Sequence, residues 1–147
     1  MSAGFYGEYK HTIDLKGRVF VPRKLKDGLG DEFIVTKGLN NCLFVYSMEG
    51  WNIFTEKLKE LPISNKKAVA ISRKIFAGVD EVTTDKQGRI LLKQVLRNYA
   101  SIDKDVYVLG VGNRVEIWDK DSWEKYDSES GNIEDLAEEM ELNNLFI

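Results

Sequence analysis

The sequence DLKGR at residues 14–18 returns as DKQGR at residues 85–89, 71 positions further along the chain. Both stretches keep an Asp, a Gly and an Arg at the same spacing. Two unrelated turns can share such a pattern, so the first question is whether the similarity extends beyond the turns.

The similarity extends along most of the chain. With one residue of slippage after the first helix, six pairs of identical or similar residues align: Gly17 with Gly88, Arg18 with Arg89, Leu25 with Leu96, Asn41 with Asn113, Tyr46 with Trp118 and Trp51 with Trp123. Patterns typical of strands and helices recur in the same order, which indicates an internal duplication.

Each copy is expected to begin with a strand, a turn and a second strand. Residues 9–14 place Tyr9, His11 and Ile13 on one face, as a strand does. In the Asp-x-x-Gly-Arg turn, Gly can adopt positive φ and Asp can accept hydrogen bonds from nearby backbone N–H groups. The second strand is expected over residues 18–21 in the first copy and 89–92 in the second.

A short helix follows in each copy. In the first copy we expect it to start near Pro22 and to end at Gly30, with Leu25 and Leu29 buried. In the second copy it is expected over residues 93–100. Its predicted buried residues are Val95, Leu96 and Tyr99, and its outward residues are Lys93 and Arg97.

A hairpin and a further helix complete each copy. Residues 33–46 and 106–118 read as hairpins centred on Gly and Asn. Ser47 and Asp119 follow them and are suited to cap the next helices. We also expect a basic helix over residues 64–77 and a single acidic helix over residues 132–144, whose apolar stripe contains Ile133, Leu136 and Met140.

The predicted fold class is α+β. A copy of about 45 residues is too short to bury a stable core alone, so the two copies should interlock around a pseudo-two-fold axis and close a small barrel with flanking helices. We assign residues 1–62 to the first module and its trailing helix, and 63–78 to a connecting basic helix. Residues 79–126 form the second module, and 127–147 an acidic tail that is partly disordered or helical.

The charge is distributed unevenly. The chain has a net charge of −3, yet residues 1–125 carry 21 basic and 17 acidic side chains, and all seven remaining acidic residues lie after Tyr126. A mildly basic body with an acidic tail is consistent with nucleic-acid contact. No signal peptide or membrane-spanning run is evident, and the single Cys42 cannot form an internal disulfide, so we expect a cytoplasmic, nucleoid-associated protein.

Enzymatic machinery is not evident in the sequence. The only histidine, His11, shares a strand face with apolar residues and has no apparent catalytic partner. Cys42 lies in an apolar hairpin strand and reads as a small buried residue. No metal-ligand spacing or phosphate-binding loop occurs, so we expect no enzyme activity, metal, cofactor or small-molecule substrate.

The duplicated turns suggest double-stranded DNA as a partner. A planar guanidinium at Arg18 or Arg89 can meet a guanine edge or a phosphate, and Asp14 or Asp85 could hold it in place. Nearby positive charge, including Lys16, Lys86 and Arg23, would add phosphate affinity. From the residues alone, an alternative remains equally open: the Asp and Arg pairs only brace the turns of a protein-interaction module.

The resemblance to a known family favours the DNA interpretation. The blocks GEYKHTIDLKGRVFVP, GLNNCLFVY, DKQGRILL and GVGNRVEIWDKDSWEKY resemble, in order and spacing over about residues 5–126, the MraZ family of bacterial transcriptional regulators. The resemblance implies two AbrB-like swapped-hairpin DNA-binding modules per chain. It further implies a homo-oligomeric ring that binds short direct repeats in the promoter of the division and cell-wall gene cluster containing its own gene.

By this resemblance, the Asp-x-x-x-Arg motif of the family falls on Asp14 and Arg18 and again on Asp85 and Arg89. The sequence departs from the family pattern at Lys93, where members often have Pro, so we expect a less fixed helix start in the second module. The acidic tail also varies across the family, and its role does not follow from the resemblance.

Overall fold

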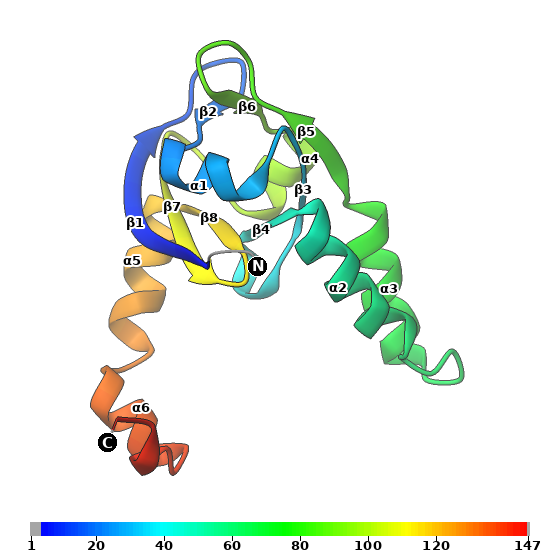
Figure 1. Ribbon diagram of the computed structural model, residues 1–147, viewed down its shortest axis with the longest axis vertical. Coiled ribbons are helices and arrows are strands. Elements are labelled where there is room, and N and C mark those ends of the chain that lie inside the picture. Colours follow the sequence, from blue (N-terminus) through cyan, green and yellow to red (C-terminus); the bar gives the residue numbers. More distant parts are fainter. Residues whose placement is uncertain (1–3, 147) are drawn as a thin grey trace.

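The computed structural model describes residues 4–146. They form an antiparallel six-stranded sheet, a separate two-stranded ribbon and six α-helices (Figure 1). In spatial order, the strands of the sheet are β1 (Phe5–Thr12), β7 (Asp105–Gly112), β8 (Val115–Asp119), β4 (Leu43–Ser47), β3 (Glu32–Lys37) and β5 (Asp80–Thr83). The ribbon pairs β2 (Arg18–Phe20) with β6 (Arg89–Leu91).

Both sheets combine strands from the two copies. β1 of the first copy pairs with β7 of the second over its full length, from Phe5 opposite Gly112 to Thr12 opposite Asp105. β5 of the second copy pairs with β3 of the first, and the two hairpins meet through β4 and β8. The α+β class is therefore confirmed. The closed barrel is not confirmed, because the strand order within the described residues ends at β1 on one side and β5 on the other.

Side chains on the two faces of the sheet form two separate apolar clusters. Along β3, Phe33 and Val35 point into one cluster and Ile34 into the other, as the two-residue period of a strand requires. The larger cluster also contains Val19 and Ile90 from the ribbon. Fully burying a side chain of this size contributes about 1.5–3 kcal/mol. The ribbon is thus attached to the body by apolar packing from both copies.

The helices are α1 (Arg23–Leu29), α2 (Met48–Lys59), α3 (Lys66–Ala77), α4 (Gln94–Tyr99), α5 (Lys120–Glu129) and α6 (Ile133–Glu139). Short 3₁₀ turns lie at Leu39–Asn41 and Asn143–Phe146. Figure 1 places the ribbon at one end of the molecule and α6 at the other. The α2–α3 pair and α5 leave the sheet on different sides and diverge.

Helix starts agree with the sequence. Side-chain oxygens of Ser47 and Asp119 accept hydrogen bonds from backbone N–H groups in the first turns of α2 and α5, which confirms both predicted caps. Lys93 precedes α4 with φ −61° and ψ 149°, close to the φ −53° and ψ 139° of Pro22 before α1. The expectation of a less fixed helix start at Lys93 is not reflected in the backbone, which adopts the Pro-like conformation without Pro.

Several sequence expectations were wrong in detail. Val95 is 57% exposed, because α4 is only six residues long and buries Leu96 and the adjacent Ala100 instead. Arg97 does not point outward but is half-buried, because its guanidinium packs against Gly17 of the first turn. The acidic helix ends at Glu139, well before residue 144, and Glu141 has a left-handed φ of 57° that is incompatible with a continuing helix.

No helix within residues 4–146 has both the length and the apolar content needed to cross a membrane.

Candidate nucleic-acid interface

The ribbon brings the two Asp-x-x-Gly-Arg turns into one structural unit. Antiparallel pairing sets Val19 opposite Ile90 and Phe20 opposite Arg89. Because Val19 and Ile90 are almost fully buried, the alternate positions, which include both arginines, lie on the outer face. Two segments 71 positions apart in sequence therefore present their arginines from the same ribbon.

The first turn is closed by its own aspartate. Asp14 Oδ1 accepts hydrogen bonds from the backbone N–H groups of Lys16, at 3.0 Å, and Arg18, at 2.9 Å. The Gly17 N–H donates to the Asp14 carbonyl at 3.0 Å. Gly17 has φ +92°, where a side chain would be strained, so Gly is required at this position.

The second turn repeats this geometry. Asp85 Oδ1 accepts hydrogen bonds from the backbone N–H groups of Gln87 and Arg89, both at 2.9 Å. Gly88 has φ +81° and donates its N–H to the Asp85 carbonyl at 3.0 Å. The retained Asp and Gly of the duplication thus have the same structural cause in both copies.

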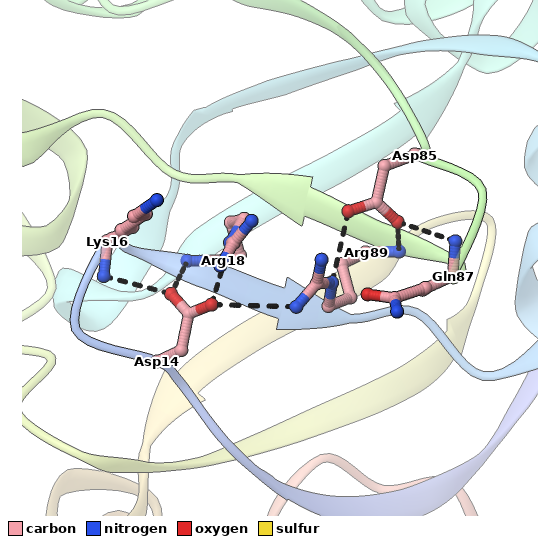
Figure 2. A network of polar contacts seen from close by, with 6 residues as sticks. All are labelled: Asp14, Lys16, Arg18, Asp85, Gln87 and Arg89. Atoms are coloured by element: carbon pink, nitrogen blue, oxygen red, sulfur yellow. Dashed lines mark hydrogen bonds and ion pairs between the residues drawn. The ribbon is translucent and has the colours of Figure 1, made fainter.

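Each arginine is held by the carboxylate four residues before it (Figure 2). Arg18 Nε lies 2.7 Å from Asp14 Oδ2, and Arg89 Nε lies 3.0 Å from Asp85 Oδ2. Arg89 also reaches the other turn, with its Nη1 3.7 Å from Asp14 Oδ2. The Arg18 and Arg89 side chains remain 33% and 28% exposed, so the guanidinium groups are oriented but accessible.

Backbone hydrogen bonds join the turns to one another. The Val21 N–H donates to the Gly88 carbonyl at 2.9 Å, and the Leu92 N–H donates to the Gly17 carbonyl at 2.8 Å. Each turn is therefore fixed by the strand that leaves the other turn. Displacing one turn would disturb both arginines.

Local hydrogen bonds favour the ionised form of both aspartates and lower their pKa values. Hydrogen bonding from the Arg18 backbone N–H is the main influence that lowers the pKa of Asp14, and the Arg18 guanidinium adds to it. The Arg89 backbone N–H lowers the pKa of Asp85 in the same way, with further contributions from the Gln87 N–H and the Arg89 side chain. An ionised carboxylate is the stronger acceptor for a guanidinium.

Two residues that support the turns, Arg97 and Phe20, were not recognised from the sequence. Arg97 Nε donates to the Leu92 carbonyl at 2.9 Å, and its guanidinium lies under the first turn, where a Cβ added at Gly17 would be 2.8 Å from Arg97 Cζ. Phe20 lies in the same way under the second turn, 3.0 Å from a Cβ added at Gly88. Only the cross-copy strand register, which sequence periodicity does not provide, would have revealed them.

The other candidate residues are less closely connected to this pair of turns. Lys16 is exposed on the first turn beside Asp14, and Lys86 is exposed on the second. Arg23 is exposed at the first residue of α1, immediately after the ribbon strand. The structure therefore brings Asp14, Arg18, Asp85 and Arg89 together and places the remaining three as separate surface cations.

Both halves of the chain match one known protein family. The family described as "MraZ protein, putative antitoxin-like" matches twice, over residues 5–74 and 75–144, so the duplicated halves of the chain are two repeats of that family. The chain belongs to the MraZ family.

Its relatives share nearly the full length of the chain. A protein of Acetivibrio thermocellus named transcriptional regulator MraZ is 53% identical over 139 residues, covering 94% of this chain and 97% of its own. Proteins with the same name are 50% identical in Carboxydothermus hydrogenoformans and 48% identical in Clostridium tetani, covering 92% of this chain and 96% of their own length in each case. Transcriptional regulation is a non-enzymatic role.

The two residues that were considered for catalysis, His11 and Cys42, are packed within the fold. His11 is half-buried and packs edge-on against the Phe20 ring, with ring centroids 5.2 Å apart, and burial lowers its pKa. Cys42 is fully buried, which raises the pKa of its thiol. Among the described residues, no group of three or more His, Cys, Asp or Glu side chains is arranged to hold a metal ion.

Proposed function

We propose that this protein is a sequence-specific DNA-binding transcriptional regulator. The observation that carries the proposal is the pair of arginines held on one rigid ribbon, each oriented by an aspartate and each partly exposed. Membership of a family whose relatives are named transcriptional regulators supports the same function.

In this proposal Arg18 and Arg89 contact DNA directly. A guanidinium fixed at Nε still has its Nη donors, which can meet guanine O6 and N7 or phosphate oxygens. Asp14 and Asp85 orient the arginines. The exposed cations Lys16, Lys86 and Arg23 add phosphate contacts and therefore salt-dependent affinity.

The proposed target is the promoter of the division and cell-wall gene cluster that contains the gene for this protein. A homo-oligomeric ring would present several ribbons at fixed spacing to short direct repeats, so that weak single contacts combine into tight binding by avidity. Bound there, the ring would block RNA polymerase. This function places the protein in the cytoplasm, associated with the nucleoid.

The proposed architecture behind this function is the AbrB-like swapped hairpin. The mixing of strands from both copies in one sheet and the pairing of β2 with β6 support it. We propose residues 1–62 and 79–126 as the two modules, 63–78 as the connecting helix and 127–147 as the tail.

One observation favours a second candidate. Both arginines already pair with aspartates, so the motif could act only as a brace within an oligomeric protein-interaction module. In that case replacing either arginine would leave a carboxylate without its partner and lower stability without any effect on DNA.

Fluorescence anisotropy with a labelled duplex from upstream of the gene tests the proposal. The DNA-binding function predicts tighter binding to this duplex than to a scrambled duplex of equal length, and affinity that falls steeply with salt concentration. Equal and weak binding to both duplexes at moderate salt would contradict it and favour the protein-interaction module.

A further inference from the structure

The C-terminal helix α6 exposes an apolar stripe. None of its residues is buried; Ile133 and Leu136 on its apolar face are 73% and 42% exposed, and Met140, directly after the helix, is 68% exposed. A helix of seven residues is far shorter than the ~12–15 residues that an isolated helix needs to be even marginally stable in water. Such a helix gains stability by laying its apolar side on another surface.

The rest of α6 is strongly acidic. Glu134, Asp135, Glu138 and Glu139 all lie on this helix, and no Lys or Arg occurs after Lys125. A surface that binds α6 should therefore combine an apolar groove with a positively charged rim.

The helix pair α2 and α3 provides such a surface. Between these helices and the β3–β4 hairpin lies a cavity of about 430 Å³, which we call the α2–α3 groove. Its lining includes the apolar residues Leu39, Phe54, Leu58 and Ile71 and the two cations Lys37 and Lys74. The volume lies within the ~300–1,000 Å³ typical of binding pockets, so the groove can accept several side chains.

The rim of this groove is positively charged. Lys37 Nζ lies 5.4 Å from the centre of the Tyr99 ring, and Lys74 is exposed. Residues 48–77, which contain both helices, carry six basic and three acidic side chains. Leu39 and Ile71 are 71% and 49% exposed, so apolar surface is open to a partner beside these cations.

We propose that α6 of a second copy of this chain docks in the α2–α3 groove. Its apolar stripe would cover Leu39 and Ile71, and its acidic residues would face Lys37 and Lys74. The charges of the two surfaces are complementary, and apolar side chains remain exposed on both the helix and the groove.

The position of α6 favours docking in the groove of a second copy, not in the groove of its own chain. Figure 1 shows α6 beyond the end of α5, on the side away from α2 and α3. Only residues 130–132 connect α5 to α6, and three residues span at most about 10 Å. Such a short connection keeps α6 near the end of α5, away from the groove of its own chain (Figure 1).

This inference rests on the homo-oligomer of the proposed function, to which it assigns one interface. The contact involves one surface on one copy and a different surface on the next, so it joins copies head to tail, as ring assembly requires. It leaves the DNA-binding ribbon at the other end of the molecule uncovered.

Cross-linking between two differently tagged variants tests the contact. One chain carries Leu39→Cys and the other Leu136→Cys, and the mixture is treated with a short bismaleimide. Cys42 is buried and its thiol pKa is raised, so the introduced thiols react selectively. A matched control replaces Leu39→Cys by Ile63→Cys, which lies outside the groove lining and is 92% exposed.

The inference predicts a product containing one chain of each tag, at least about tenfold more abundant than the product of the Ile63→Cys control. Adding Lys37→Glu and Lys74→Glu to the Leu39→Cys chain should abolish this excess. Adding Glu138→Lys and Glu139→Lys to the other chain should restore it. A merely apolar or accidental contact would not show this reversal.

Three results would overturn the inference. A cross-chain product no more abundant than the control would exclude docking in the groove. A chain carrying both Leu39→Cys and Leu136→Cys that cross-links only to itself would show that the occupant is its own tail. A small amphiphile retained in the groove in native mass spectrometry, with no cross-chain product, would identify a ligand pocket instead.

Sedimentation velocity on the wild-type chain distinguishes a wrongly assigned interface from the absence of an oligomer. If the wild type is oligomeric while the cross-link is absent, the proposed oligomer stands and another surface holds it together. If the wild type is monomeric, both the oligomer and this interface are wrong.

Discussion

Arg89 Nη1 lies 3.7 Å from Asp14 Oδ2, so the arginine of the second turn reaches the carboxylate of the first. Asp14 therefore faces both arginines, whereas Asp85 forms its ion pair with Arg89 of its own turn. The two copies look equivalent in sequence, but this contact makes the first aspartate the common support of the site.

This asymmetry predicts unequal effects of two matched substitutions. Asp14→Asn should reduce the preference for the upstream duplex over a scrambled duplex more than Asp85→Asn does, because it loosens both arginines. We expect a loss of about fivefold or more for Asp14→Asn, the lower end of the ~1–3 kcal/mol that a good base contact provides. Anisotropy titrations with both duplexes measure the ratio, and equal losses in the two variants would argue against the cross-turn contact.

The aspartates also predict how stability depends on pH. Their folded-state pKa values lie below the ordinary 3.8, so their contribution to stability is complete above this value and is lost as the pH falls through the lowered pKa values. The melting temperature of an Asp14→Asn, Asp85→Asn variant should therefore fall less than that of the wild type between about pH 5 and pH 3. Asp103→Asn, Asp127→Asn is the matched control at exposed positions, and equal slopes in all three proteins would contradict the prediction.

The packing under the first turn predicts a coupled pair of substitutions. Gly17→Ala should destabilise the protein by about 1–2 kcal/mol from the positive φ alone. The total loss of stability should be larger, because the new Cβ would also lie 2.8 Å from Arg97 Cζ. Adding Arg97→Ala should remove the loss caused by this close contact but not the loss caused by the positive φ.

Chemical denaturation of the single and double variants measures this coupling. Gly112→Ala is the control, since Gly112 also has a positive φ, of +77°, but open space where the Cβ would lie. Strictly additive losses for Gly17→Ala and Arg97→Ala would show that Arg97 does not support the turn.

The Pro-like backbone at Lys93 predicts a stabilising substitution. Lys93→Pro should fit the observed φ of −61° and reduce the entropy of the unfolded chain. Lys93→Ala is the matched control, because both variants lose the ion pair between Lys93 Nζ and Asp80 Oδ1, 3.2 Å apart. Lys93→Pro should be more stable than Lys93→Ala by about 0.4–1 kcal/mol in thermal unfolding, and a less stable Pro variant would contradict this reading.

The parts of the fold that follow from local chemistry were predictable from the sequence. The caps at Ser47 and Asp119, the burial of Leu25 and Leu29, and the duplicated turns depend on residues close together in the chain. The pairing of each Asp with the Arg four residues later is local in the same sense.

The cross-copy contacts were not predictable in this way. Pairing of β2 with β6 places Arg89 near Asp14 across 75 residues, and no local pattern encodes that register. Arg97 reads as a surface residue on a helix until the register places it under Gly17. The early end of the acidic helix depends on a left-handed φ at Glu141, a conformation that the identity of this residue does not favour.

Direct contact of Arg18 and Arg89 with DNA is tested by measuring DNA binding and thermal stability on the same variant. Anisotropy titrations against the upstream duplex at several salt concentrations would compare the wild type with Arg18→Ala, Arg89→Ala, alongside their melting temperatures. Lys66→Ala, Lys67→Ala removes two exposed cations from the start of α3, outside the lining of the α2–α3 groove, and serves as the control.

The DNA-binding account predicts that the Arg18→Ala, Arg89→Ala variant loses about 30-fold or more in affinity, with a shallower salt slope. Its melting temperature should stay close to that of the wild type, because ion pairs this exposed contribute little to stability. The control should bind as the wild type does. Unchanged DNA binding together with a clear loss of stability would contradict the account and show that the two turns are structural braces.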